Sequence, residues 1–218
     1  MNTTMYSGQL SAPSSFFVCG ASGSGKSVFV KRLIENKDFL FDNKIERVVW
    51  CYGHYQDLFQ DHALKEVNFV QGFNLEDFAE NTVSTMVVVG DLMAELAECK
   101  ELVSMFTNNG HLNITTVFLT QNLFFKSSVY RSCSLNANYF VIMRMIRDKK
   151  QIMTLVHQMF ADQAKFAKEA ILDATKKPFS YVLIDTRQST PEELRLRTKI
   201  FPDDWTEGFY AQRVYVPK

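Results

Sequence analysis

Short apolar runs alternate along this chain with segments whose apolar positions recur at helical spacing. Runs of four to six apolar residues are typical of buried strands. The predicted strands cover 16–19, 48–52, 67–70, 86–89, 114–119, 139–143 and 181–184. Helices are expected from the first strand to about residue 35, over 75–79, from 92 to a turn at 108–110, and over 149–160 and 163–176. This alternation predicts an α/β fold, with a mainly parallel sheet, right-handed crossovers and flanking helices.

The connection between the first strand and the first helix carries the strongest chemical signal. It follows the pattern G-x-x-x-x-G-K-S through Gly20, Ala21, Ser22, Gly23, Ser24, Gly25, Lys26 and Ser27. Glycines let such a loop turn its backbone N–H groups toward phosphate oxygens, and the helix that follows adds its positive end. We expect Lys26 to reach the β- and γ-phosphates of a nucleoside triphosphate and the Ser27 hydroxyl to ligate Mg²⁺. The pattern therefore predicts a P-loop.

Two further strand ends offer the groups that hydrolysis needs. The apolar strand over 86–89 runs into Gly90 and Asp91, and Asp91 is the candidate for the Mg²⁺ shell. The alternative is that Asp91 caps a helix starting at residue 92. Gln121 follows the strand over 114–119, where it could sense the γ-phosphate or orient water, or be an ordinary polar strand end. Glu95 is interpreted first as a helix-surface residue, and second as a replacement acid.

Composition narrows the class of protein without changing this interpretation. The chain has 218 residues, 46% of them apolar and nineteen of them Phe, which is typical of a folded domain. No apolar run approaches the about 20 residues that span a bilayer. Four separated cysteines, a polar start and a formal net charge of zero predict a reducing compartment and exclude a surface coated with nucleic acid. Cys19 and Cys51 are expected to be buried thiols.

The motifs together resemble the FtsK–HerA class of P-loop ATPases. More narrowly, they resemble the genome-packaging ATPases of poxvirus-related double-stranded DNA viruses and of Maverick/Polinton and adintovirus elements. The resemblance rests on the glycine loop, on D-L-M at 91–93 and on T-Q-N at 120–122. It also includes R-S-C-S-L-N-A-N-Y over 131–139, R-D at 147–148, D-A-T over 173–175, E-L-R-L-R over 193–197 and I-F-P over 200–202. It spans about residues 14 to 203 and implies a tail over 1–14, a P-loop ATPase domain over 15–187 and a C-terminal arm over 188–218.

The resemblance implies a ring-forming motor that uses ATP and Mg²⁺ to push double-stranded DNA into a preformed capsid. Its partners would be the DNA, capsid or portal vertex proteins and further copies of the chain, with no membrane. The motor would work inside the host cell, in the nucleus or a cytoplasmic virus factory, and transiently at the procapsid. Such motors complete each nucleotide site with an arginine from the neighbouring subunit. Arg131 and Arg147 are the candidates for that arginine.

One position departs from the pattern of this family. Its members usually carry two adjacent acids at the strand end, whereas this chain has Gly90 followed by Asp91. The departure leaves open a nucleotide-binding scaffold with weak or no hydrolysis. A P-loop domain of this size is also typical of nucleoside-type kinases, although the sequence shows no arginine-rich lid. The three classes of function differ in nucleotide turnover. The turnover of a motor is stimulated by DNA, a kinase needs a phosphate acceptor, and a scaffold shows no turnover.

Overall fold

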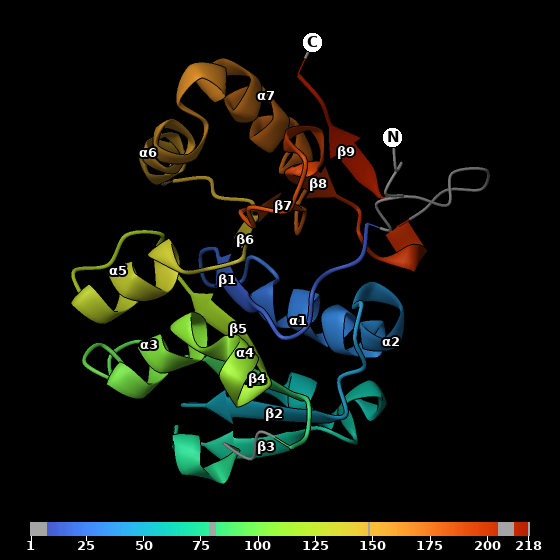
Figure 1. Ribbon diagram of the computed structural model, residues 1–218, viewed down its shortest axis with the longest axis vertical. Coiled ribbons are helices and arrows are strands. Elements are labelled where there is room, and N and C mark those ends of the chain that lie inside the picture. Colours follow the sequence, from blue (N-terminus) through green and yellow to red (C-terminus); the bar gives the residue numbers. More distant parts are fainter. Residues whose placement is uncertain (1–7, 79–81, 148, 205–211, 218) are drawn as a thin grey trace.

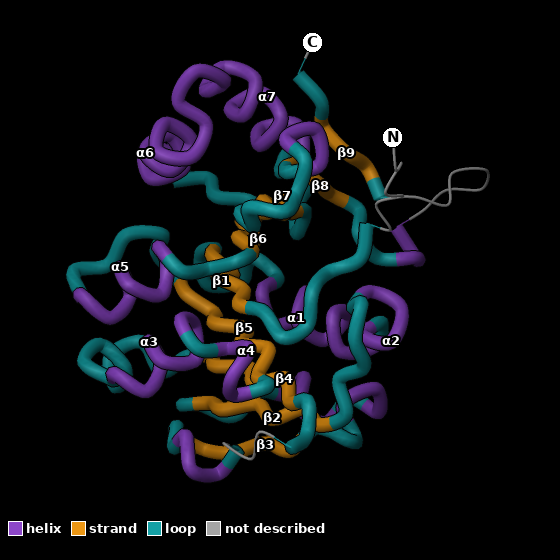
Figure 2. The backbone as a smooth tube through the Cα atoms, in the orientation of Figure 1, coloured by secondary structure: helices purple, strands orange, loops and turns teal. Residues whose placement is uncertain are grey.

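The strands of the protein form one mixed sheet, seen in a computed structural model that describes residues 8–78, 82–147, 149–204 and 212–217 (Figure 1, Figure 2). The strands are β1 (Ser15–Cys19), β2 (Arg47–Tyr52), β3 (Asn68–Gln71), β4 (Thr85–Gly90), β5 (Ile114–Thr120), β6 (Tyr139–Met143), β7 (Tyr181–Asp185), β8 (Leu196–Thr198) and β9 (Arg213–Tyr215). Their order across the sheet is β3-β2-β4-β5-β1-β6-β7-β8-β9.

The sheet is parallel through its first six strands and antiparallel at one end. β1 pairs in parallel with β5 and β6, and β4 pairs in parallel with β2 and β5. β7, β8 and β9 then add in antiparallel fashion beyond β6. The predicted α/β class with a mainly parallel sheet is confirmed. The strands β8 and β9 were not predicted, and they lie within the segment 188–218 that was expected to form an arm.

Helices cover both faces of the sheet. They are α1 (Lys26–Glu35), α2 (Lys37–Leu40), α3 (Lys100–Thr107), α4 (Asn109–Leu112), α5 (Ser128–Leu135), α6 (Lys149–Phe160) and α7 (Ala164–Ala174). Short 3₁₀ turns cover Asp57–Gln60, His62–Leu64, Leu75–Asp77, Ala161–Gln163, Glu192–Leu194 and Pro202–Asp204. Figure 1 shows α1 and α2 on one side of the sheet and α3, α4 and α5 on the other. Among the described residues, no helix combines the length and apolar character that crossing a bilayer requires.

The prediction that a helix begins at residue 92 was wrong. Helix α3 begins at Lys100, and Cys99 precedes it in an extended conformation. Leu92 and Leu96 are buried as their spacing suggested, but they belong to a single turn closed by a 3.0 Å hydrogen bond from Leu96 N to Leu92 O. Apolar residues four apart therefore bury one turn here without continuing into a helix.

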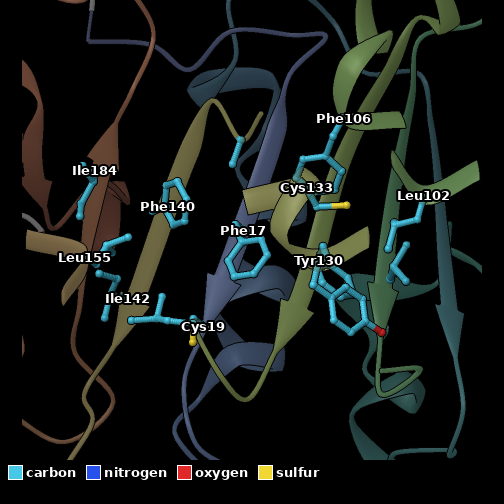
Figure 3. Packing of buried hydrophobic residues seen from close by; sticks show 14 of the residues in the cluster. Phe17, Cys19, Leu102, Phe106, Tyr130, Cys133, Phe140, Ile142, Leu155 and Ile184 are labelled. Carbon is cyan, nitrogen blue, oxygen red and sulfur yellow. The ribbon is translucent and has the colours of Figure 1, made fainter. Parts of the chain in front are cut away.

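Alternation along the strands divides the apolar side chains between two cores. On β1, Phe17 and Cys19 face the core beneath α3, α5, α6 and α7, which Figure 3 shows from close by. Phe16 and Val18 face the core beneath α1. Cys19 and Cys51 are fully buried thiols that form no disulfide, as expected. The two cores hold the sheet rigidly between helices, so the loops at its carboxyl edge have fixed positions.

A buried ion cluster joins β7 to β8 at the antiparallel end. The Arg197 Nη2 atom lies 2.9 Å from Asp185 Oδ2, and both side chains are fully buried. Arg187 Nη2 lies 2.8 Å from the same oxygen. Burial alone would raise the pKa of Asp185, but the hydrogen bonds and charges of the two arginines outweigh burial and hold that pKa below its ordinary value.

The segment that precedes β1 lies against the domain. Leu10 is fully buried and forms an isolated bridge with Phe41, and Ala12 N donates to Asp42 Oδ1 at 2.8 Å. Arg197 also reaches this segment, since its Nη1 atom donates to the Gly8 carbonyl at 2.8 Å. Residues 1–7 of the expected tail lie outside the described residues.

Candidate functional site

A cavity of about 710 Å³ opens at the carboxyl ends of β1, β4 and β5. Its lining includes five residues of the glycine loop, Ser22, Gly23, Gly25, Lys26 and Ser27. Gly90, Asp91 and Gln121 line it from the neighbouring strand ends. The structure therefore brings together the loop, the acid and the amide that the sequence placed 30 to 100 residues apart along the chain.

The loop needs glycine for conformation at two places and for space at a third. Gly23 and Gly25 have φ angles of 72° and 98°, in the left-handed region that side chains rarely adopt. A Cβ atom on Gly20 would lie 2.5 Å from Ser24 Oγ and 2.6 Å from Met143 Cβ. Gly25 is also the residue directly before α1, so the loop delivers the chain to a helix that begins at Lys26. The predicted strand, loop and helix are confirmed.

The side chains of Lys26 and Ser24 are two loop groups suited to binding an anion. Lys26 Nζ donates to its own loop, to Gly20 O at 2.6 Å and Ala21 O at 3.0 Å. Burial lowers the pKa of Lys26, and the nearby Cys19 and Asp91 only partly oppose that change. Ser24 Oγ is buried and has no hydrogen-bond partner among the described residues. A buried donor and a desolvated cation at a helix N-terminus fit an anion such as a phosphate chain.

Asp91 lies at the cavity but does not cap a helix. Its φ of 59° places it in the left-handed region, and helix α3 starts nine residues later. His54 Nδ1 lies 2.9 Å from Asp91 Oδ2, and the two side chains are 86% and 44% exposed. The alternative reading of Asp91 as an N-cap is therefore wrong, because the backbone after it turns instead of entering a helix. Asp91 is left facing the cavity with a histidine partner that sequence reasoning missed.

Close packing fixes the backbone at Asp91. A Cβ atom on Gly53 would lie 2.5 Å from the Asp91 carbonyl oxygen, so only glycine lets the β2 loop approach this closely. A Cβ atom on Gly90 would lie 3.2 Å from Leu119 Cδ1, the end of a flexible side chain. A Cβ atom at position 90 would therefore require Leu119 to shift by a few tenths of an ångström.

Gln121 lies between the acid and the glycine loop because β5 lies between β4 and β1. It follows β5 directly, and its backbone N–H donates to Met93 Sδ at 3.4 Å. Tyr130 donates in turn to the Met93 carbonyl. These contacts connect the segment after Asp91 to the end of β5. Glu95 is exposed and lines neither this cavity nor the one described next.

The two candidate arginines differ in position. Arg147 lines a second cavity of about 620 Å³, together with Ser22, Gly23, Ser24 and Arg144, on the β6 side of the glycine loop. Arg131 is exposed on α5 and lines neither cavity. Asp148, which forms a pair with Arg147 in the sequence motif, lies outside the described residues. Within one copy of the chain, Arg147 is therefore the one of these two candidates that lies at the loop.

Several cavity residues had no sequence signal. Arg32 lines the first cavity from α1, where Asp203 and Asp204 hold its Nη2 atom at 2.7 and 2.8 Å. Phe179 lines both cavities, and Tyr181 lines the first. Arg32 and the pair Phe179 and Tyr181 come from distant parts of the chain, and only the tertiary structure brings them to one cavity. Hydrophobic periodicity and composition therefore could not have identified these cavity residues.

The residues present fit Mg²⁺ bound together with a nucleotide. Mg²⁺ in such sites takes one or two protein oxygens, and phosphate and water supply the rest. The Ser27 hydroxyl and the Asp91 carboxylate both line the cavity and are hard oxygen ligands. No group of three or more His, Cys, Asp or Glu residues among the described ones could hold a metal without a nucleotide. Binding of the metal would therefore depend on the phosphates.

No protein-family model and no curated protein matches the chain, but solved structures do. The genome packaging NTPase B204 from Sulfolobus turreted icosahedral virus 2, in complex with ATP-gammaS, superposes with a TM-score of 0.54 at 10% identity. That match covers 85% of this chain and 95% of B204. The Thermomonospora curvata Type VII secretion ATPase EccC matches with a TM-score of 0.52 at 14% identity, over 82% of this chain and 24% of the EccC domain. The cytoplasmic domain of EssC matches with a TM-score of 0.50 at 12% identity, over 94% and 40% of the two chains.

These similarities concern the fold. The P-loop NTPase fold expected from the sequence motifs is thereby confirmed for this chain.

Proposed function

We propose that this chain is a Mg²⁺-dependent ATPase that drives double-stranded DNA into a viral capsid as a homo-oligomeric ring. The observation that carries the proposal is the convergence of Lys26, Asp91 and Gln121 on one cavity at the glycine loop. B204, whose structure is superposable over most of both chains, is a genome packaging NTPase and was captured with ATP-gammaS and with AMP. The partners of this chain would be capsid or portal proteins, and the chain would act inside the host cell.

We assign a role in this proposal to each side chain at the cavity. The loop N–H groups and Lys26 bind the β- and γ-phosphates, and Lys26 then exchanges its bonds to Gly20 O and Ala21 O for phosphate oxygens. Ser27 and Asp91 hold Mg²⁺, which neutralises charge on the phosphates when bound. Gln121 lies between loop and acid, where it orients the attacking water.

The direct test of the ATPase is Lys26→Ala. This variant is expected to fold and to lose nucleotide turnover, since the ammonium is the cation that the loop presents to the phosphates. Lys168→Ala is the matched control, because Lys168 is an exposed lysine on α7 that lines neither cavity. ATPase activity in a folded Lys26→Ala protein equal to that of the control would exclude this loop as the active site.

The motor is tested by DNA and by mixing variants. Double-stranded DNA should stimulate turnover, whereas a kinase would need a phosphate acceptor. Arg147 lines the second cavity beside its own loop, so we expect Arg131 to act across the subunit interface. Arg131→Ala should bind ATP and lose hydrolysis. Mixing it with Lys26→Ala should then restore part of the activity, because some interfaces contain both intact halves. Mixed rings without recovered activity would contradict the shared site.

Gly90 and the contact between Asp91 and His54 support one second candidate, a nucleotide-binding scaffold with little hydrolysis. A single acid must serve the metal here, and its carboxylate has a histidine as partner. A scaffold would bind ATP in a Lys26-dependent way, but would show no turnover with or without DNA. The same binding and turnover measurements therefore separate it from the motor.

A further inference from the structure

Two exposed apolar side chains lie beside the glycine loop. Phe179 is 69% exposed and Val28 is 52% exposed, and both line the first cavity. The Phe179 Cδ1 atom lies 3.3 Å from the position that a Cβ atom on Gly25 would occupy, so the aromatic ring adjoins the end of the loop. An exposed phenyl ring at the mouth of a cavity is available to a ligand.

The sheet order places Phe179 opposite the polar groups of the site. Strand β1, which leads into the glycine loop, lies between β5 on one side and β6 on the other. Asp91 and Gln121 follow β4 and β5, on the first side. Phe179 comes two residues before β7, which lies beyond β6 on the second side. A nucleotide whose γ-phosphate points toward Asp91 must therefore extend its sugar and base toward β7.

The backbone at Phe179 is held in an unusual conformation. Its φ of 59° lies in the left-handed region, which is a genuine outlier for a bulky side chain. Pro178 precedes it, and Ser180 donates from both its N–H and its Oγ to the Lys177 carbonyl, closing the turn around it. Such strained residues concentrate at ligand sites. Neither burial nor backbone preference explains a phenylalanine here.

We propose that Phe179 is the platform on which the base of the bound nucleoside triphosphate stacks, with Val28 bounding the same end of the cavity. The inference rests on the proposed nucleotide site and adds which nucleotides that site prefers. A phenyl face recognises the π-face of a base and makes no hydrogen bond to the base edge. The platform therefore favours purine over pyrimidine nucleotides, because the larger ring system overlaps more of the phenyl face, and it separates ATP from GTP only weakly.

Binding of three ligands to the full chain tests this platform. The ligands are the non-hydrolysable imido analogues of ATP and CTP and inorganic tripolyphosphate, each titrated with Mg²⁺ by calorimetry. Phe179→Ala should weaken the ATP analogue by about 5- to 150-fold, the range that stacking of one base on an aromatic ring supplies. It should leave tripolyphosphate affinity unchanged and abolish the preference for ATP over CTP. Phe179→Trp should keep that preference.

The controls separate the platform from the nucleotide site. Phe39→Ala removes a phenyl that is 53% exposed on α2 and should change none of the affinities. If wild-type protein binds neither the analogues nor tripolyphosphate, the nucleotide site itself is wrong. If wild type binds all three and Phe179→Ala binds the ATP analogue equally well, the site stands and the platform is refuted. An equal loss of tripolyphosphate and ATP analogue in Phe179→Ala also refutes it, because the ring would then act through the loop.

Discussion

Arg197→Met provides a quantitative test of the buried ion cluster at the β7–β8 end of the sheet. Arg197 and Asp185 are both fully buried, and Arg197 also donates to the Gly8 carbonyl and to Gln212 Oε1. Methionine keeps an apolar chain on β8 but removes the guanidinium group. The substitution therefore leaves a buried carboxylate with one arginine fewer and a backbone carbonyl without this donor.

The expected loss of stability follows from the contacts that Asp185 keeps after the substitution. Breaking a buried ion pair by removing one partner costs about 3–5 kcal/mol. Arg187 still lies 2.8 Å from Asp185 Oδ2, so the lower end of that range is expected. For a chain of this length, a loss of about 3 kcal/mol lowers Tm by about 6–12 °C. Combining Arg197→Met with Asp185→Asn should cost less than the sum of the two single changes, since the double variant buries neither the Asp185 carboxylate without Arg197 nor the Arg197 guanidinium without Asp185.

Urea unfolding measures these differences, and fluorescence of the buried Trp50 reports the loss of the core. Arg213→Met is the matched control, because Arg213 lies 2.8 Å from Asp173 in a pair whose side chains are 55% and 46% exposed. That exposed pair should contribute at most about 1 kcal/mol. If Arg197→Met destabilises the protein no more than Arg213→Met does, the buried pair does not stabilise this end of the sheet.

Three further changes test the geometry. Gly90→Asp adds a second carboxylate beside Asp91 and requires Leu119 Cδ1, 3.2 Å from the new Cβ atom, to move; it should lower the Mg²⁺ concentration needed for nucleotide binding, and a higher requirement in a metal titration contradicts this. Gly53→Ala should reduce turnover while the fold persists by circular dichroism, since its Cβ would displace the Asp91 backbone; wild-type kinetics would show that this approach is unimportant. Asp185→Asn should be less stable than wild type above about pH 4, with the difference shrinking as pH falls through the lowered pKa of Asp185; a difference that stays constant on acidification refutes the assignment.

The sequence alone determined the local features of this protein. The glycine loop was readable because its chemistry depends on eight consecutive residues, and the backbone of Gly23 and Gly25 has the left-handed conformation that such a loop needs. The buried strands could be predicted because each is a continuous apolar run. Apolar residues at helical spacing also led to a prediction of α3 that begins too early in the chain. Asp91 and Gln121 were found because each directly follows such a strand.

Only the tertiary structure decided which distant residues share the site. Asp91 contacts His54 from 37 positions away, and Phe179, just before β7, reaches Gly25 from the far side of β6. The position of β5 between β1 and β4 sets Gln121 between loop and acid. Strand order and chain crossings are set by the packing of whole elements around two cores. No local pattern encodes these contacts, because their partners meet only after the sheet is assembled.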